Sequence, residues 1–142
     1  MEKLFLLVSI CFLASCSITQ KISPVNFDGV GNSEICIIEN PKVTMDSFLV
    51  ELQTSLINEG FGTRIINKDA SVGDCKLTCT YTANWGWDLL MYLKYAEINI
   101  YDQGALSGNA VYDARSGSGN MGKFISAKSK INELVSGIFL KK

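Results

Sequence analysis

Histidine is absent from all 142 residues of this chain. The commonest general base of enzymes and the commonest transition-metal ligand are therefore both missing. The cysteines include no Cys-x-x-Cys unit, so the ligand spacing of a structural zinc site is missing as well. We expect a protein that holds no metal and no cofactor, and that carries out no chemistry of its own.

The chain also has no marked excess of positive or negative charge. The 13 lysines and arginines are matched by 14 aspartates and glutamates, which gives a formal net charge of −1. A nucleic-acid-binding protein must offset the phosphate backbone with a basic face. The charge balance therefore predicts no nucleic-acid partner.

The apolar run near the start is too short for a membrane span. It covers Leu4–Leu13 behind Lys3 and has about half of the roughly 20 residues that a spanning helix needs. The small residues Ala14–Ser15 follow, and then Cys16, whose thiol can carry a diacylglycerol. This combination is typical of a bacterial lipoprotein signal. We predict that residues 1–15 are a signal peptide cleaved before Cys16.

Lipidation of Cys16 would determine where the protein resides. Several acyl chains, each contributing about 0.8 kcal/mol per buried methylene, hold a protein at a membrane almost permanently. An aspartate after the cysteine is the usual signal for retention in the inner membrane, and Ser17 stands there instead. We therefore expect the periplasmic face of the outer membrane. Residues 16–32 contain Ser, Pro, Asn and Gly with little periodicity, which predicts a tether.

Residues 33–142 have the length and pattern of one domain. The segment 34–39 is short, β-branched and bounded by turn residues, as a buried strand would be. Apolar residues then recur at helical spacing over Met45–Leu56, with Thr44 as the N-cap, and a second strand is predicted at 63–67. A strand, a helix and a strand in this order predict a right-handed crossover with parallel pairing.

Three further strands are predicted at about 75–83, 90–101 and 106–113. The short connections between them predict an antiparallel meander. A final helix carries an apolar stripe that runs from Phe124 to Ile138. The predicted fold is α+β with two layers: a mixed five-stranded sheet, made of a β-α-β crossover and then an antiparallel β-meander, with two helices on one face.

Three cysteines remain in the mature chain once Cys16 is committed to lipid, in a compartment that oxidises thiols. Cys75 and Cys79 lie on one predicted strand with their α-carbons about 13 Å apart, and a disulfide needs less than about 7 Å. Cys36 is therefore expected to bond one of the two. We prefer Cys75, near the start of its strand, and Cys79 remains the alternative. The cysteine left free is expected to be a small buried apolar side chain.

Aromatic side chains are dense around the connection predicted at 84–88. A tryptophan pair that packs across two strands would pin the hairpin, whereas the same rings on the surface would form a docking patch. Met91, Leu93 and Tyr95 would share one face of the strand that follows this connection. The candidate contact residues for an envelope-protein partner are Trp85, Trp87, Met91, Leu93 and Tyr95.

A glycine-rich segment imitates a phosphate-binding loop. Residues 117–123 match its G-x-x-x-x-G-K core and lie between a predicted strand and a predicted helix. Phe124 occupies the position of the magnesium-binding serine or threonine, however, and its spacing fits the apolar stripe of the final helix. We expect a glycine-rich turn and no bound nucleotide.

Several segments together resemble the Sbal-family lipoproteins, which are small bacterial lipoproteins. The segments are the lipobox at Cys16, Cys-Ile-Ile-Glu-Asn-Pro at 36–41, and residues 80–89, 95–98, 112–114 and 123–127. The resemblance covers most of the mature domain and implies its fold and location, but it brings no activity. The family pattern also has a cysteine where Cys75 stands. This supports a bond between Cys36 and Cys75, whereas Cys79 departs from the pattern.

The expected function is a binding or scaffolding module, anchored to the membrane and non-catalytic, that contacts another envelope component. One alternative is an auxiliary subunit of a transport or assembly complex in the envelope. Another is a small envelope hydrolase, which would need a cleft beside Asp88, Glu97, Asp113 or Cys79.

The substitution Cys16→Ala tests the anchor. Because it removes the thiol that would be acylated, we expect the domain to move from the membrane fraction to the soluble fraction. Fractionation of cells with a salt wash measures the change. Membrane association that persists in high salt would contradict lipidation at Cys16.

Overall fold

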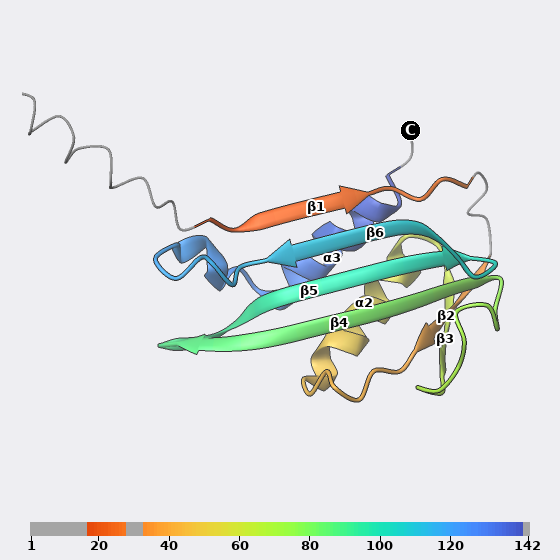
Figure 1. The fold of residues 1–142 in the computed structure, drawn as a ribbon, viewed down its shortest axis with the longest axis horizontal. Helices are drawn as coiled ribbons and strands as arrows, with labels where there is room; N and C mark the ends of the chain where they lie inside the picture. The colour runs from red at the N-terminus through yellow and green to blue at the C-terminus, as the bar shows by residue number, and fades with distance from the viewer. Residues whose placement is uncertain (1–16, 28–32, 141–142) are drawn as a thin grey trace, which may run out of the picture.

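A mixed sheet extends through the whole of the structure, a computed structural model that describes residues 17–27 and 33–140. The elements in chain order are β1 (Thr19–Ser23), β2 (Glu34–Ile38), α2 (Asp46–Asn58), β3 (Gly62–Ile66), β4 (Leu77–Asp88), β5 (Leu90–Asp102), β6 (Ala105–Asp113), the 3-10 helix η1 (Met121–Phe124) and α3 (Ala127–Ile138). The strand order is β1-β6-β5-β4-β2-β3, and α2 and α3 lie behind the sheet in Figure 1. The α+β class is confirmed, but the sheet has six strands and not five.

The predicted crossover joins β2 to β3 through α2, and the two strands pair in parallel. Helix α2 turns Phe48, Leu52 and Leu56 into the core, and burial of each such side chain contributes about 1.5–3 kcal/mol. Met45 is the N-cap residue and makes no side-chain cap hydrogen bond, so the prediction of Thr44 in this role is wrong. Beyond the helix, Gly60 adopts φ +100°, which only glycine reaches without strain.

The meander of β4, β5 and β6 is antiparallel as predicted, but its first hairpin is longer than expected. Residues 84–88, expected as a connection, continue β4. Apolar pairs sustain the ladder there, since Trp85 faces Leu93 and Trp87 faces Met91 across the two strands. The hairpin therefore extends past the helical layer, as Figure 1 shows at the lower left.

A bulge in β5 changes which of its residues face the helices. Asn84 pairs with Tyr95 and Trp85 pairs with Leu93, so Lys94 has no partner on β4. The extra residue shifts the alternation of side chains along the strand. Leu93 is consequently buried in the core, as Ala96 is, whereas Tyr95 is only half-buried. The prediction that Leu93 and Tyr95 share one face is therefore wrong.

The sixth strand, β1, lies within residues 16–32, which were expected to be a tether. It pairs antiparallel with the outer edge of β6, with Thr19 opposite Asp113. The side chain of Gln20 donates to Glu133 of α3 at 2.8 Å. Ile22 packs closely on Gly137 of α3, since a Cβ added to Gly137 would lie 2.5 Å from the Cδ1 of Ile22. Sequence patterning missed β1 because, in this short polar segment, Ile22 is the residue that packs against the core.

The C-terminal helix begins later than its apolar stripe predicts. Ser126 is its N-cap and accepts from the backbone N–H of Ser129 at 3.1 Å. Phe124 belongs to η1 and packs edge-on against Tyr92, with ring centroids 5.9 Å apart. The core between α3 and the sheet is closed by Ile131, Leu134, Val135 and Ile138.

A disulfide joins Cys36 to Cys75, the pairing preferred from the sequence. It ties the buried strand β2 to the loop that leads into β4. Cys79 is free and fully buried, and burial raises the pKa of its thiol to about 12. The thiol therefore stays protonated and unreactive at neutral pH.

The double substitution Cys36→Ala/Cys75→Ala tests what the bond contributes. It opens a loop with a sequence separation of 39 residues, and the chain-entropy estimate for a loop of this length is about 4 kcal/mol of unfolding free energy. Urea unfolding measures the loss. Cys79→Ala is the control, because it removes a thiol outside the bond. Equal stability of the double variant and the wild type would contradict the estimate.

Candidate functional site

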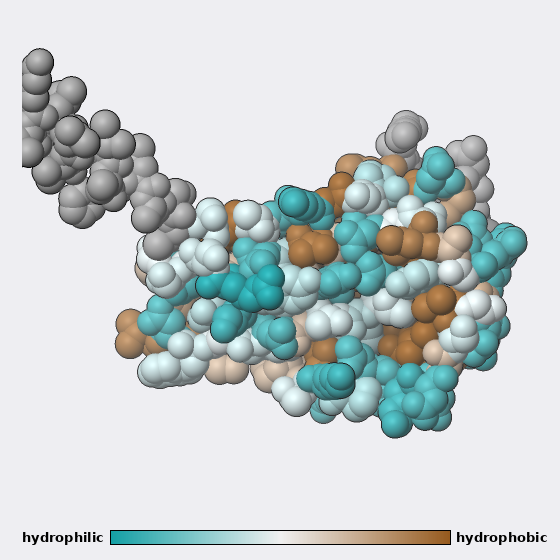
Figure 2. All heavy atoms as spheres, in the orientation of Figure 1, coloured by the Kyte–Doolittle hydropathy of each residue, from teal (hydrophilic) through white to brown (hydrophobic). Residues whose placement is uncertain are grey.

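The end of the β4–β5 hairpin exposes a cluster of large apolar side chains. We call residues 87–91 the hairpin tip. Figure 2 shows apolar atoms at this end of the molecule, on the left. Clustered exposure of this kind marks an interaction site more often than single exposed residues do. The exposed fractions are 71% for Trp87, 82% for Leu89, 63% for Leu90 and 56% for Met91.

The tip is exposed because the core face of the hairpin continues beyond the helices. Trp85 still reaches the core, where its ring meets Phe48 of α2 edge-on at 5.9 Å. Trp87 lies two residues farther along β4 and therefore on the same face. Figure 1 shows no helix behind this last part of the hairpin. The apolar surface of Trp87 and Met91 is thus left without cover from the described helices.

The opposite side of the hairpin is held by η1. Lys123 is buried to 2% exposure, and its Nζ donates to Asp88 at 2.6 Å and to the Ser118 carbonyl at 2.8 Å. The same ammonium lies 5.1 Å from the ring centroid of Tyr92. In turn, the Tyr92 ring covers Gly86 so closely that a Cβ there would lie 2.7 Å from it. The lysine of the phosphate-loop-like segment therefore has a structural role at the tip.

The predicted contact residues divide into three groups. Trp87 and Met91 meet at the hairpin tip, Trp85 and Leu93 pack in or against the core, and Tyr95 lies on the open face of the sheet. Sequence analysis missed Leu89 and Leu90, which complete the tip. Two adjacent leucines directly after the connection predicted at 84–88 were the available signal, because residues next to a turn are usually polar or glycine.

Leu89 forms the turn itself and has φ +64°. This left-handed conformation is uncommon for residues other than glycine, asparagine and aspartate, and a leucine there is strained. The chain therefore places a large apolar side chain, 82% exposed, on a strained backbone at this turn.

The open face of the sheet carries a row of hydrogen-bonded polar side chains. The Tyr95 hydroxyl donates to Glu97 at 2.7 Å, and this bond raises the pKa of Tyr95. Asn99 donates to Glu97 at 3.1 Å and accepts from Asn109 at 2.6 Å. Arg115 stacks on Tyr95, 4.6 Å from the ring centroid. These groups largely satisfy one another and present a flat polar surface.

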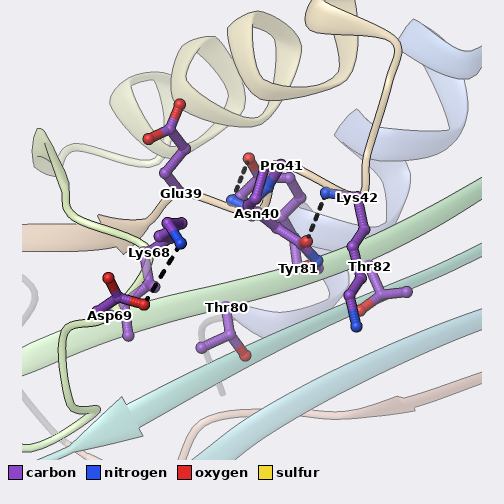
Figure 3. Close-up of a pocket in the computed structure, with 10 residues that line it drawn as sticks. Glu39, Asn40, Pro41, Lys42, Lys68, Asp69, Thr80, Tyr81 and Thr82 are labelled. Atoms are coloured by element: carbon purple, nitrogen blue, oxygen red, sulfur yellow. Dashed lines mark hydrogen bonds and ion pairs between the residues drawn. The ribbon is translucent and has the colours of Figure 1, made fainter.

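A shallow hollow of about 400 Å³ lies where β2 ends and the chain enters α2 (Figure 3). Asn40 shapes it, since its side chain donates to the Tyr81 carbonyl at 2.8 Å and its backbone N–H donates to the Tyr81 hydroxyl at 3.1 Å. Four charged residues line the hollow, and two of them, Lys68 and Asp69, form an exposed ion pair at 3.7 Å; the other two are Glu39 and Lys42. Asn40 and Tyr81 thus hold the connection between β2 and α2 in place.

The carboxylates that were considered for a hydrolase are each engaged by a neighbouring side chain. Asp88 pairs with Lys123, Glu97 with Tyr95, and Asp113 with Arg115, whose hydrogen bonds lower the pKa of Asp113. The hollow of Figure 3 is lined by none of these carboxylates and not by Cys79. Within the described part of the chain there is no cluster of three or more metal-ligating residues. Cys16 lies outside the described residues.

The helices of residues 17–27 and 33–140 include none with the length and apolarity of a membrane span. No family model matches the chain, and no curated protein is similar to it in sequence.

Solved structures share the fold. The PelC dodecamer from Paraburkholderia phytofirmans aligns with a TM-score of 0.60 and 15% identity, over 89% of this chain and 100% of that one. A variant of the same PelC aligns with a TM-score of 0.57 and 17% identity, over 85% and 98%. A minor lipoprotein from Acinetobacter baumannii aligns less well, with a TM-score of 0.36 and 14% identity, over 73% and 84%. At these identities the PelC structures establish similarity of fold alone.

The substitutions Trp85→Ala and Trp87→Ala should separate core from surface. Because Trp85 packs on Phe48, its loss should lower the free energy of unfolding by about 2–3 kcal/mol. Trp87 is 71% exposed, so its loss should change stability by less than about 0.5 kcal/mol. Urea unfolding of the two variants checks both values. A large loss from Trp87→Ala would mean that its ring supports the fold.

Proposed function

We propose that this protein is a bacterial lipoprotein in which acylated Cys16 holds the α+β domain at the periplasmic face of the outer membrane. The domain acts there as a non-catalytic binding or scaffolding module for another envelope component. The observation that supports the proposal is the position of β1, which begins at Thr19, three residues after the lipobox cysteine. A three-residue connection spans at most about 11 Å, so acylation would hold the domain directly against the bilayer.

The attachment of β1 to the domain supports the same proposal. Lys130 of α3 is nearly buried, and its Nζ donates to Gln20 at 2.9 Å and to Glu133 at 2.8 Å. Farther along, the backbone N–H of Val25 donates to the Ile138 carbonyl at 2.9 Å. The strand next to the anchor is therefore tied both to β6 and to α3, and an anchored N-terminus would fix the orientation of the whole sheet.

A second candidate function is a subunit of a larger assembly in the envelope. The fold comparison supports it, because two structures with a similar fold are of a PelC dodecamer. The outermost strands β1 and β3 each leave one edge unpaired within the described sheet, and such edges are available for contacts between subunits. In such an assembly, several copies of this chain would together form the scaffold.

The mass of the protein extracted from its own membrane tests the proposal. We expect a chain that lacks residues 1–15 and carries additional mass on Cys16 that corresponds to acyl chains. Light scattering on the same sample in detergent gives the number of chains in each particle, and a multiple of the single-chain mass supports the second candidate. An unmodified Cys16 in the mature protein would refute the lipoprotein proposal.

A further inference from the structure

We propose that the hairpin tip inserts into the interfacial layer of the membrane that carries the anchor, so that the tip and the acyl chains together hold the domain upright. The inference rests on the proposed lipidation of Cys16. It adds a membrane-contact site, made by Trp87, Leu89, Leu90 and Met91.

Strand register places the anchor and the tip at the same end of the sheet. Thr19 lies opposite Asp113 on β6, Asp113 lies opposite Tyr95 on β5, and Tyr95 lies opposite Asn84 on β4. The start of β1 is therefore level with Asn84, and the chain enters the sheet from the side on which the tip projects (Figure 1). A membrane that holds Cys16 lies on this side.

The lengths on this side agree with insertion of the tip. Leu89 lies about 17 Å farther along the hairpin than Asn84, at the rise of a strand. Amphipathic segments sink about 5–10 Å into the boundary between headgroups and acyl chains. With the tip at that depth, Thr19 would stand roughly 7–12 Å above the bilayer surface, and the connection to Cys16 spans about 11 Å. Because about 11 Å is the greatest reach of this connection, the anchor would reach the bilayer when the tip sinks about 6 Å or more.

The chemistry of the tip suits the interface between water and lipid. Tryptophan is enriched at the headgroup level because its ring is apolar and its N–H is polar. Asp88 is the single charged residue between Asn84 and Leu93. Its carboxylate pairs with the Lys123 ammonium at 2.6 Å, which reduces the cost of bringing it near the acyl chains.

The conformation of Leu89 supports a contact at this position. Its φ of +64° is strained, and its side chain is 82% exposed, so packing within the described chain does not compensate for the strain. Strained residues persist where a function requires them. Contact with lipid would bury this side chain, whereas a protein partner at the same place would have to fit between the domain and the bilayer.

Fluorescence quenching tests the proposal on the full-length lipidated protein. The protein is reconstituted into vesicles of phosphatidylethanolamine and phosphatidylglycerol that contain phosphatidylcholine with brominated acyl chains. Trp85→Phe leaves Trp87 as the reporter. The matched control combines Trp85→Phe and Trp87→Phe with Leu106→Trp, because Leu106 is 59% exposed at the opposite end of the sheet. We expect the bromines to quench Trp87 several-fold more than the tryptophan at position 106. Equal quenching would overturn the proposal.

A tip variant separates insertion from folding. Leu89→Gly/Leu90→Ser removes apolar surface and relieves the strained turn, so the melting temperature should be retained. Quenching of Trp87 should fall to the level measured for the control tryptophan at position 106. Unchanged quenching in this variant would overturn the role of the two leucines.

The mass of the same sample distinguishes the two proposals. Acylated Cys16 with unquenched Trp87 would overturn insertion and leave the lipoprotein proposal intact. If Cys16 is unmodified, the lipoprotein proposal fails, and quenching of Trp87 on added vesicles then decides insertion alone. Shielding of Trp87 from aqueous acrylamide only when another envelope protein is present would assign the tip to a protein partner and overturn insertion.

Discussion

The unpaired Lys94 in β5 determines how the hairpin meets the rest of the molecule. Between Lys94 and the hairpin turn, Leu93 points to the helices, as its partner Trp85 on β4 does. On the other side of Lys94, the residues of β5 that point to the helices are Ala96, Ile98 and Ile100. The backbone N–H of Ala114 donates to the Lys94 carbonyl at 2.9 Å, so the bulge also holds the chain that leaves β6. Without this extra residue, Met91 and Leu93 of β5 would point to the open face of the sheet.

Core and surface are continuous in β4 because its alternation of side chains runs without interruption through Tyr81, Ala83, Trp85 and Trp87. A single apolar face begins under α2, where Trp85 meets Phe48, and ends at Trp87 and Met91, beyond the first turn of that helix. The other side of the hairpin is closed by the buried ammonium of Lys123. The tip is therefore a rigid extension of the domain and presents one apolar face.

The fold class, the parallel crossover and the antiparallel meander were predictable because each depends on periodicity within a segment. The sixth strand was not, because β1 is held by pairing with β6 and by the contacts of Gln20 with α3, which are long-range and leave little trace in a short polar sequence. The tryptophans indicated the tip, but their separate roles depend on where α2 begins, because Phe48 in its first turn covers Trp85. The position of Lys94 as an unpaired residue follows from register, which no local pattern specifies.

In the orientation proposed for the anchored domain, the edges of the sheet would run along the membrane normal. Strand β1 forms one of these edges and β3 the other. Molecules fixed at one height in a bilayer lose two rotations and one translation, so they meet mainly side to side and at matching levels. Lys21 on β1 and Arg64 on β3 each place a cationic side chain on an edge strand. Charged residues of this kind discourage uncontrolled edge-to-edge pairing, and they become more important when diffusion is confined to two dimensions.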